Sequence, residues 1–190
     1  LDAIECCREG LELVPRGSLE SLRLRGPLAY LLYLVGNFYE AEAMATSLIA
    51  ELSGELDPAR TERPNPDFLP HLAMAYFIRG CVLQVHGDHP QGLSAPLLRD
   101  AQRSLRTAER LLASLAPESG PLRNRSIAQT ARAAAREVEV LLEDAEPLDI
   151  VEETLALLSS AEDIASLDSF AAESLGWCCL IASRVVLQFN

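Results

Sequence analysis

Residues 29–48, AYLLYLVGNFYEAEAMATSL, contain the pattern that decides the fold. Gly36 and Asn37 interrupt this pattern, and both tolerate the left-handed backbone conformation that ends a helix. After them, the small residues Ala41 and Ala45 would permit a close approach to the first helix. The apolar residues before the turn recur at helical spacing and share one face: Leu28, Leu31, Leu32 and Val35. The stretch therefore predicts two antiparallel helices with one apolar seam between them.

A similar spacing of small residues occurs twice in the chain. Each copy starts with a small residue and reaches a glycine seven residues later, where a turn is expected. In the second copy an extra segment, residues 89–97, separates this turn from the next helix. The residues that define the two copies are Ala29, Gly36, Phe38, Ala41, Gly80, Gly87, Ala101 and Ala108.

This arrangement resembles the tetratricopeptide repeat, a helix–turn–helix unit of roughly 34 residues. The resemblance implies an all-α fold in which antiparallel helix hairpins stack as a short α-solenoid of about seven helices. It also implies a non-catalytic role in binding other proteins. A strand within residues 1–100, or a continuous helix through either glycine turn, would argue against the solenoid.

The rest of the chain supports one helical domain over residues 1–190. Hydrophobic residues make up 49% and aromatic residues only 5%, which is typical of a core rich in leucine and alanine. Residues 54–66 are polar and rich in proline, and predict a long loop. Helical patterns run to both ends and no methionine begins the chain, so we expect a piece of a longer protein. The expected helices cover residues 1–13, 18–35, 38–52, 67–86, 97–115, 123–143, 147–161 and 167–189.

Two proline-containing segments affect the expected helix boundaries. Gly26-Pro27 predicts a break inside the second helix, because proline lacks a backbone donor. Residues 13–18, LVPRGS, match a thrombin recognition site of the kind used in expression tags, so a cloning scar is one interpretation. We favour a natural loop between helices, with Ser18 capping the next helix.

Charge and cysteine content limit the partners and the compartment. The net charge of −12 argues against direct nucleic-acid binding, which requires a basic surface. Five cysteines, two pairs of them adjacent, make a poor disulfide framework and favour an intracellular location, cytoplasmic or nuclear. No apolar run reaches the ~20 residues that a membrane-spanning helix requires.

The sequence contains no strong catalytic, metal or cofactor motif. Cys81, His86, Asp88 and His89 are near one another, but no second Cys/His cluster completes a set of four metal ligands. Phosphate loops and nucleophile motifs are also absent. We therefore expect no metal, no cofactor and no enzymatic activity, and an enzyme with dispersed catalytic residues is the least favoured alternative.

The resemblance places the partner-binding surface on the inner face of the hairpins. The expected binding residues there are Tyr30, Tyr33, Tyr76 and Phe77. The same apolar face could instead seat the next packed helix. The basic clamp with which such repeats hold acidic tails is absent from these inner positions.

Two non-catalytic functions follow from the resemblance. The chain is similar to helical-repeat regions of large signalling ATPases and transcriptional regulators, which implies a scaffold or regulatory sensing domain that binds a protein or peptide. The alternative is an obligate assembly module that self-associates or joins a larger complex.

Overall fold

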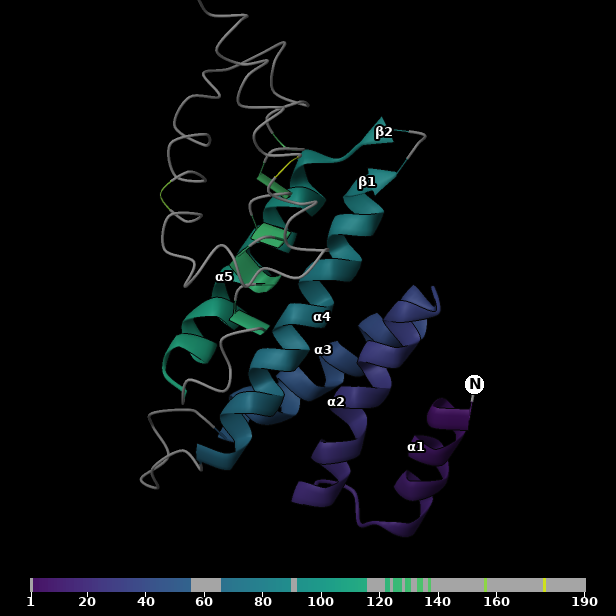
Figure 1. Cartoon of the computed structure of the whole chain (residues 1–190). Coiled ribbons are helices and arrows are strands. Elements are labelled where there is room, and N and C mark those ends of the chain that lie inside the picture. The colour runs from purple at the N-terminus through teal and green to yellow at the C-terminus, as the bar shows by residue number, and fades with distance from the viewer. Residues whose placement is uncertain are drawn as a thin grey trace, which may run out of the picture.

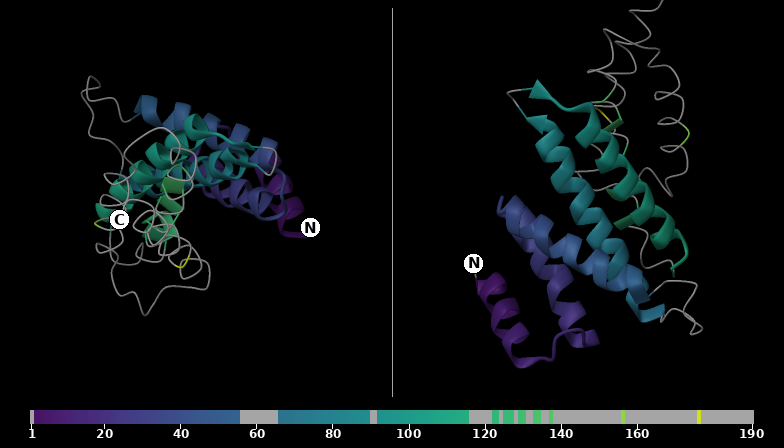
Figure 2. Two further views of the ribbon diagram at one scale, coloured as in Figure 1. Left: turned by 90° about the horizontal axis from the view of Figure 1, so that it is seen from above. Right: turned by 180° about the vertical axis from the view of Figure 1, so that it is seen from behind.

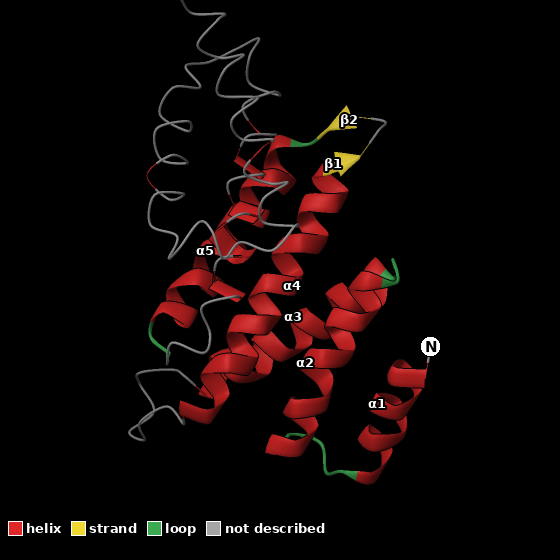
Figure 3. Cartoon of the chain, viewed as in Figure 1, coloured by secondary structure: helices red, strands yellow, loops and turns green. Residues whose placement is uncertain are grey.

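A computed structural model of the chain describes residues 2–55, 66–89 and 92–115, together with positions 122, 123, 125–127, 129, 130, 133, 134, 137, 156 and 176. Within these residues the fold is all-α apart from one very short strand pair (Figures 1 and 3). The elements are α1 (Asp2–Leu13), α2 (Leu19–Leu34), α3 (Phe38–Glu55), η1 (Pro66–Phe68), α4 (Leu69–Gly87), β1 (Asp88–His89), β2 (Gly92–Leu93) and α5 (Ala95–Ala113).

The predicted turn at Gly36 is confirmed, and it joins α2 and α3 into an antiparallel hairpin. Gly36 has a φ of 81°, in the left-handed region. Its N–H donates to the carbonyl of Tyr33 at 3.0 Å, and the N–H of Asn37 donates to the carbonyl of Leu32 at 2.9 Å. This pair of bonds is the Schellman arrangement, which satisfies carbonyls that a helix end otherwise leaves without partners. Asn37 then begins α3, because its Oδ1 accepts from the N–H of Glu40 at 3.4 Å.

Helix α2 begins as predicted but does not break where predicted. The N–H of Ser21 donates to Oγ of Ser18 at 3.1 Å, which confirms Ser18 as the N-cap. The predicted break at Gly26-Pro27 was wrong, because α2 continues through Pro27. Pro27 is exposed, so water can reach the carbonyl that it leaves without a donor. Gly26 has no Cβ to clash with the proline ring, which removes part of the usual penalty.

The second hairpin, α4 and α5, reverses direction differently from the first. Gly87 was predicted as a turn residue, but it ends α4 and does not have a positive φ. The chain turns through β1 and β2, which pair antiparallel with Asp88 opposite Leu93. The N–H of Ser94 then donates to the carbonyl of Gly87 at 2.9 Å. The strand pair therefore lies in the first part of the extra segment noted in the second copy, and α5 already begins at Ala95.

The strand pair also bears on the expected solenoid. A strand within residues 1–100 was not expected, so an entirely helical reading of that stretch was wrong. The pair is two residues long on each side and lies within the connection between α4 and α5 (Figure 3). It therefore replaces no helix, and the all-α class stands. The pair nevertheless counts against the expected solenoid, and the described residues do not confirm a stack of about seven helices.

Gly80 and Gly87 allow α4 and α5 to pack closely. A Cβ on Gly80 would lie 2.5 Å from Cγ of Leu105, and one on Gly87 would lie 3.0 Å from Cγ of Leu98. The two glycines are seven residues apart on α4, and the two leucines are seven residues apart on α5. The same face of α4 therefore contacts the same face of α5 at two levels along the helices. The close approach explains why glycine occurs in the interior of α4, where it costs roughly 1 kcal/mol relative to alanine.

Helix α4 lies at the centre of the described fold and packs against α2, α3 and α5. Helix α1 packs against α2 on the outer side, so the helices follow one another across the molecule in chain order (Figure 2). Small residues line these contacts, and Ala29, Ala41, Ala101 and Ala108 are each fully buried. Phe38 is half-buried and packs against the main core cluster.

Some predicted elements differ at their ends or lie outside the described residues. The polar loop was predicted over residues 54–66, but α3 extends to Glu55 and η1 begins at Pro66. Residues 56–65 are not described, and neither are most residues of the helices predicted after residue 115. The described positions between 123 and 137 are helical, as predicted, and position 122 is helical as well. Glu137 accepts hydrogen bonds from Arg99 and Gln102, which ties this part of the chain to α5.

Candidate functional site

The structure brings together three of the four aromatic residues predicted to bind a partner. The ring of Tyr30 lies 6.3 Å from that of Tyr33 and 6.4 Å from that of Phe77, centroid to centroid. Phe77 is only 2% exposed, so its side chain belongs to the core. Tyr76 is half-buried and packs against both main core clusters.

Residues from later in the chain contact this aromatic face. Nη1 of Arg125 donates to Oη of Tyr30 at 3.0 Å. Leu122 packs against the core cluster that contains Phe77. The aromatic inner face is thus in contact with helical positions 122 and 125 of the same chain. This agrees with the interpretation that the face seats the next packed helix.

The cysteine and histidine residues form no reactive constellation in the described part of the chain. Cys81 is fully buried, and burial raises the pKa of its thiol far above the ordinary value although Tyr33 and Arg125 act in the opposite direction. Nδ1 of His86 lies 3.9 Å from Glu42, and its ring meets the edge of Phe38 at 6.2 Å. Among the described residues, no group of three or more His, Cys, Asp or Glu residues could hold a metal ion.

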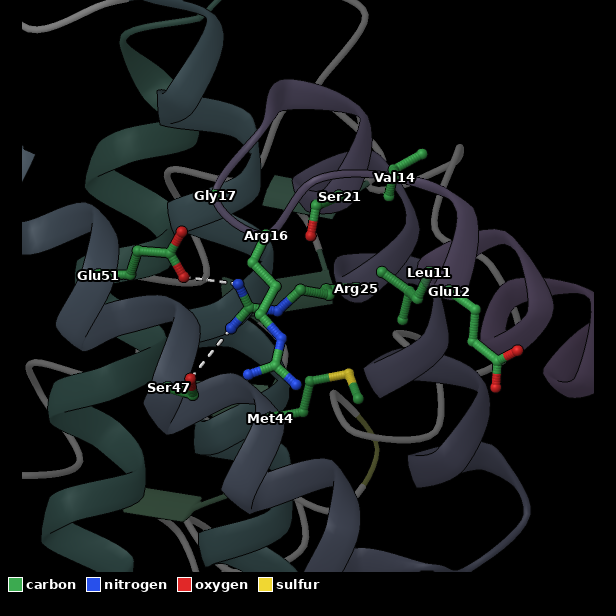
Figure 4. A pocket seen from close by; sticks show the side chains of 10 residues that line it. All are labelled: Leu11, Glu12, Val14, Arg16, Gly17, Ser21, Arg25, Met44, Ser47 and Glu51. Carbon is green, nitrogen blue, oxygen red and sulfur yellow. Dashed lines mark hydrogen bonds and ion pairs between the residues drawn. The ribbon is translucent and has the colours of Figure 1, made fainter.

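A groove opens between the α1–α2 connection, α2 and α3 (Figure 4). It encloses about 890 Å³ and is open to solvent, with Glu12, Arg16 and Ser47 exposed along it. The residues that line it are Leu11, Glu12, Val14, Arg16, Gly17, Ser21, Arg25, Met44, Ser47 and Glu51. We call this surface the α1–α3 groove.

The turn between α1 and α2 forms one wall of the α1–α3 groove. Gly17 has a φ of 79°, and the N–H of Ser18 donates to the carbonyl of Pro15 at 3.2 Å. A Cβ on Gly17 would lie 3.6 Å from Oε1 of Glu51, so the turn lies within ordinary contact distance of this α3 side chain. The LVPRGS segment thus has the structure of an ordinary connection, and it holds Arg16 over the groove (Figure 4).

An ion pair crosses the floor of the groove from α2 to α3. Nη1 of Arg25 donates to Oε2 of Glu51 at 2.5 Å, and its Nη2 donates to Oγ of Ser47 at 3.0 Å. The Arg25 side chain is 16% exposed and that of Glu51 is 35% exposed. A guanidinium with two partners in this half-buried setting is held in one geometry, which gives the groove a preformed polar centre.

Sequence reasoning did not predict this groove. It identified the α1–α2 connection and the cap at Ser18, but it placed binding on the aromatic inner face. Arg16, Arg25 and Glu51 are far apart in sequence and sit among ordinary charged residues. The one signal was the glycine after Arg16, since a turn there directs the arginine back over the next hairpin.

The comparisons with known proteins add no family. No protein-family model, no curated protein and no solved structure matches the chain. Within the described residues, no helix is long and apolar enough to cross a membrane.

Proposed function

We propose that this chain is a non-catalytic helical-repeat domain that binds another protein, as a scaffold or a regulatory sensing module. The α2–α3 hairpin packs against α4 of the α4–α5 hairpin, and this packing supports a repeat-like stack. The observation that carries the proposal is the α1–α3 groove, which is preformed, open and lined by both polar and apolar side chains.

The lining of the groove favours a protein segment over a small molecule. Sites for small molecules are enclosed and mostly apolar. Here only three of the ten lining residues are large and apolar, namely Leu11, Val14 and Met44. Protein interfaces combine apolar contacts with a polar rim, and this composition fits them better.

Site-specific photo-crosslinking tests this function. A photoreactive residue at Ser47, inside the groove, is compared with one at Thr46, which is exposed on the same helix but does not line the groove. We expect the probe at position 47 to capture a distinct protein in cells that express the chain. The purified partner should then bind Ser47→Trp more weakly than the unmodified chain. Equal capture at both positions, or unchanged affinity, would contradict binding in the groove.

A second candidate function, self-assembly, is favoured by an apolar cluster at the tip of the α2–α3 hairpin. Leu34, Val35 and Tyr39 are 58%, 61% and 86% exposed. Single exposed apolar residues are common, but three within six positions form a patch that favours association. Sedimentation velocity over a dilution series tests it, with Leu34→Ser/Tyr39→Ser as the comparison. A monomer at every concentration would remove this candidate.

A further inference from the structure

Arg16 and Arg25 both line the α1–α3 groove, but among the residues that the structure describes only Arg25 has a hydrogen-bond or ion-pair partner. Arg25 bonds to Glu51 and Ser47, so its charge is used within the fold. Arg16 extends from the α1–α2 turn and lines the same groove (Figure 4). No ion pair or hydrogen bond joins Arg16 to any residue that the structure describes.

The second acidic residue of the lining does not neutralise Arg16. The carboxylate of Glu12 lies apart from both guanidinium groups (Figure 4). Glu51 is paired with Arg25, so neither acidic residue of the lining is bonded to Arg16. A guanidinium without a partner beside apolar surface favours a carboxylate ligand, because the carboxylate neutralises its charge and accepts charge-assisted hydrogen bonds from it.

The rest of the lining indicates what else the ligand carries. Leu11, Val14 and Met44 are half-buried and make up the apolar part of the lining, which we call its apolar wall. Ser47 and Ser21 supply hydroxyl groups along the floor. A free phosphate or a small carboxylic acid would leave this apolar wall in contact with water.

We propose that the α1–α3 groove binds an acidic segment of a partner protein. An aspartate or glutamate carboxylate of that segment lies on Arg16, and a neighbouring apolar side chain packs against Leu11, Val14 and Met44. This inference rests on the proposed protein-binding function and adds the chemistry of the partner. It concerns the outer groove and not the aromatic inner face of the hairpins.

Salt dependence alone is a poor test of this proposal. The net charge of −12 repels an acidic ligand at long range, whereas Arg16 attracts it at short range. Added salt weakens both effects, so the sign of the change depends on their balance. Two local charge exchanges separate them, because Arg16→Glu and Arg23→Glu both change the net charge from −12 to −14 and only Arg16 lines the groove.

The test is a display selection of random peptides on the full chain, followed by a charge exchange. We expect the selected peptides to be enriched in an acidic residue next to an apolar one. Arg16→Glu should weaken their binding by about tenfold or more, as loss of a charge-assisted contact does. A peptide with arginine in place of its acidic residue should recover affinity for Arg16→Glu. Arg23→Glu is the matched control, since Arg23 is exposed on α2 and does not line the groove.

The outcomes separate this inference from the function on which it rests. Circular dichroism and thermal denaturation first establish that each variant is folded. Peptides that are blocked by Ser47→Trp but show no acidic preference and no effect of Arg16→Glu would overturn the inference and leave protein binding in the groove intact. If Ser47→Trp blocks none of the selected peptides, both the inference and the groove function are wrong.

Discussion

Gly80 of α4 lies directly against Leu105 of α5, with no room for a side chain between them. A Cβ on Gly80 would stand 2.5 Å from Cγ of Leu105 and 3.2 Å from the backbone carbonyl oxygen of Ala101. The second contact is the more restrictive, because a backbone atom moves only if the helix moves. This relationship holds α4 and α5 together and makes Gly80 the clearest position at which to test the fold.

Gly80→Ala should destabilise the protein. Alanine gains up to ~1 kcal/mol of helix propensity over glycine. Overpacking a tight interface costs roughly 1–3 kcal/mol, and the contact with Ala101 places Gly80 at the upper part of that range. We expect a net loss of about 1–2 kcal/mol in the free energy of unfolding, measured by urea denaturation. Gly10→Ala is the control, because its Cβ would meet only the flexible end of Leu24. Equal losses for the two variants would contradict the close packing of α4 and α5.

Gly36→Ala tests the backbone of the first turn separately from packing. Gly36 has a φ of 81°, and a Cβ added there would meet nothing within 4 Å. The cost is therefore conformational, roughly 1–2 kcal/mol for an L residue in the left-handed region. Gly36→Asn should lose less, because asparagine tolerates that conformation better. Thermal denaturation of the three proteins gives the order, and an unchanged Gly36→Ala protein would mean that the turn adopts another conformation.

Ser18→Ala should remove the N-cap of α2. The Oγ of Ser18 accepts from the N–H of Ser21, which otherwise has no intrahelical partner. The expected loss is about 1 kcal/mol in the free energy of unfolding. Ser18→Asn retains an acceptor at the same place and should remain close to the parent protein. The prediction fails if both substitutions have the same effect in chemical denaturation.

Cys81 should resist alkylation while the protein is folded. Burial raises the pKa of its thiol, so the reactive thiolate is scarce near neutral pH, and the site is closed to reagents. Cys6 is exposed and should react with iodoacetamide first. Peptide mass spectrometry after a short labelling pulse compares the two, with urea-unfolded protein as the control. Rapid labelling of Cys81 in the folded protein would show that α4 is not enclosed as described.

His71 should make stability rise with pH across the titration of histidine. Burial lowers the pKa of the His71 imidazole below its ordinary value, Arg23 lowers it further, and Asp67 opposes the shift. The unfolded chain therefore binds the proton more readily than the folded one, and acidification from about pH 7 through the folded-state pKa removes stability. His71→Gln should flatten this part of the curve, measured by urea denaturation between pH 5 and 7. An unchanged slope would exclude His71 as its source.

Local signals predicted the elements better than the contacts between them. The turn at Gly36, the cap at Ser18 and the helical class all follow from neighbouring residues, and the structure has each of them. Pro27 was expected to break α2 and does not. The expectation was wrong because Pro27 lies on the exposed side of the helix, where water can bond to the carbonyl that lacks a donor. Gly87 was assigned to a turn, but in the structure it is the last residue of α4 and packs against Leu98. Spacing alone does not distinguish a glycine needed for a turn from one needed for close helix packing.

The sequence by itself determined which segments become helices and where the first hairpin turns, since helical periodicity, capping and left-handed glycine are properties of a few adjacent residues. Only the tertiary structure decided that Phe77 is buried, that Gly80 and Gly87 lie against Leu105 and Leu98, and that Arg16 and Arg25 line the same groove. These outcomes depend on how helices approach one another, and that approach is set by the combined shape of side chains from segments distant in the chain.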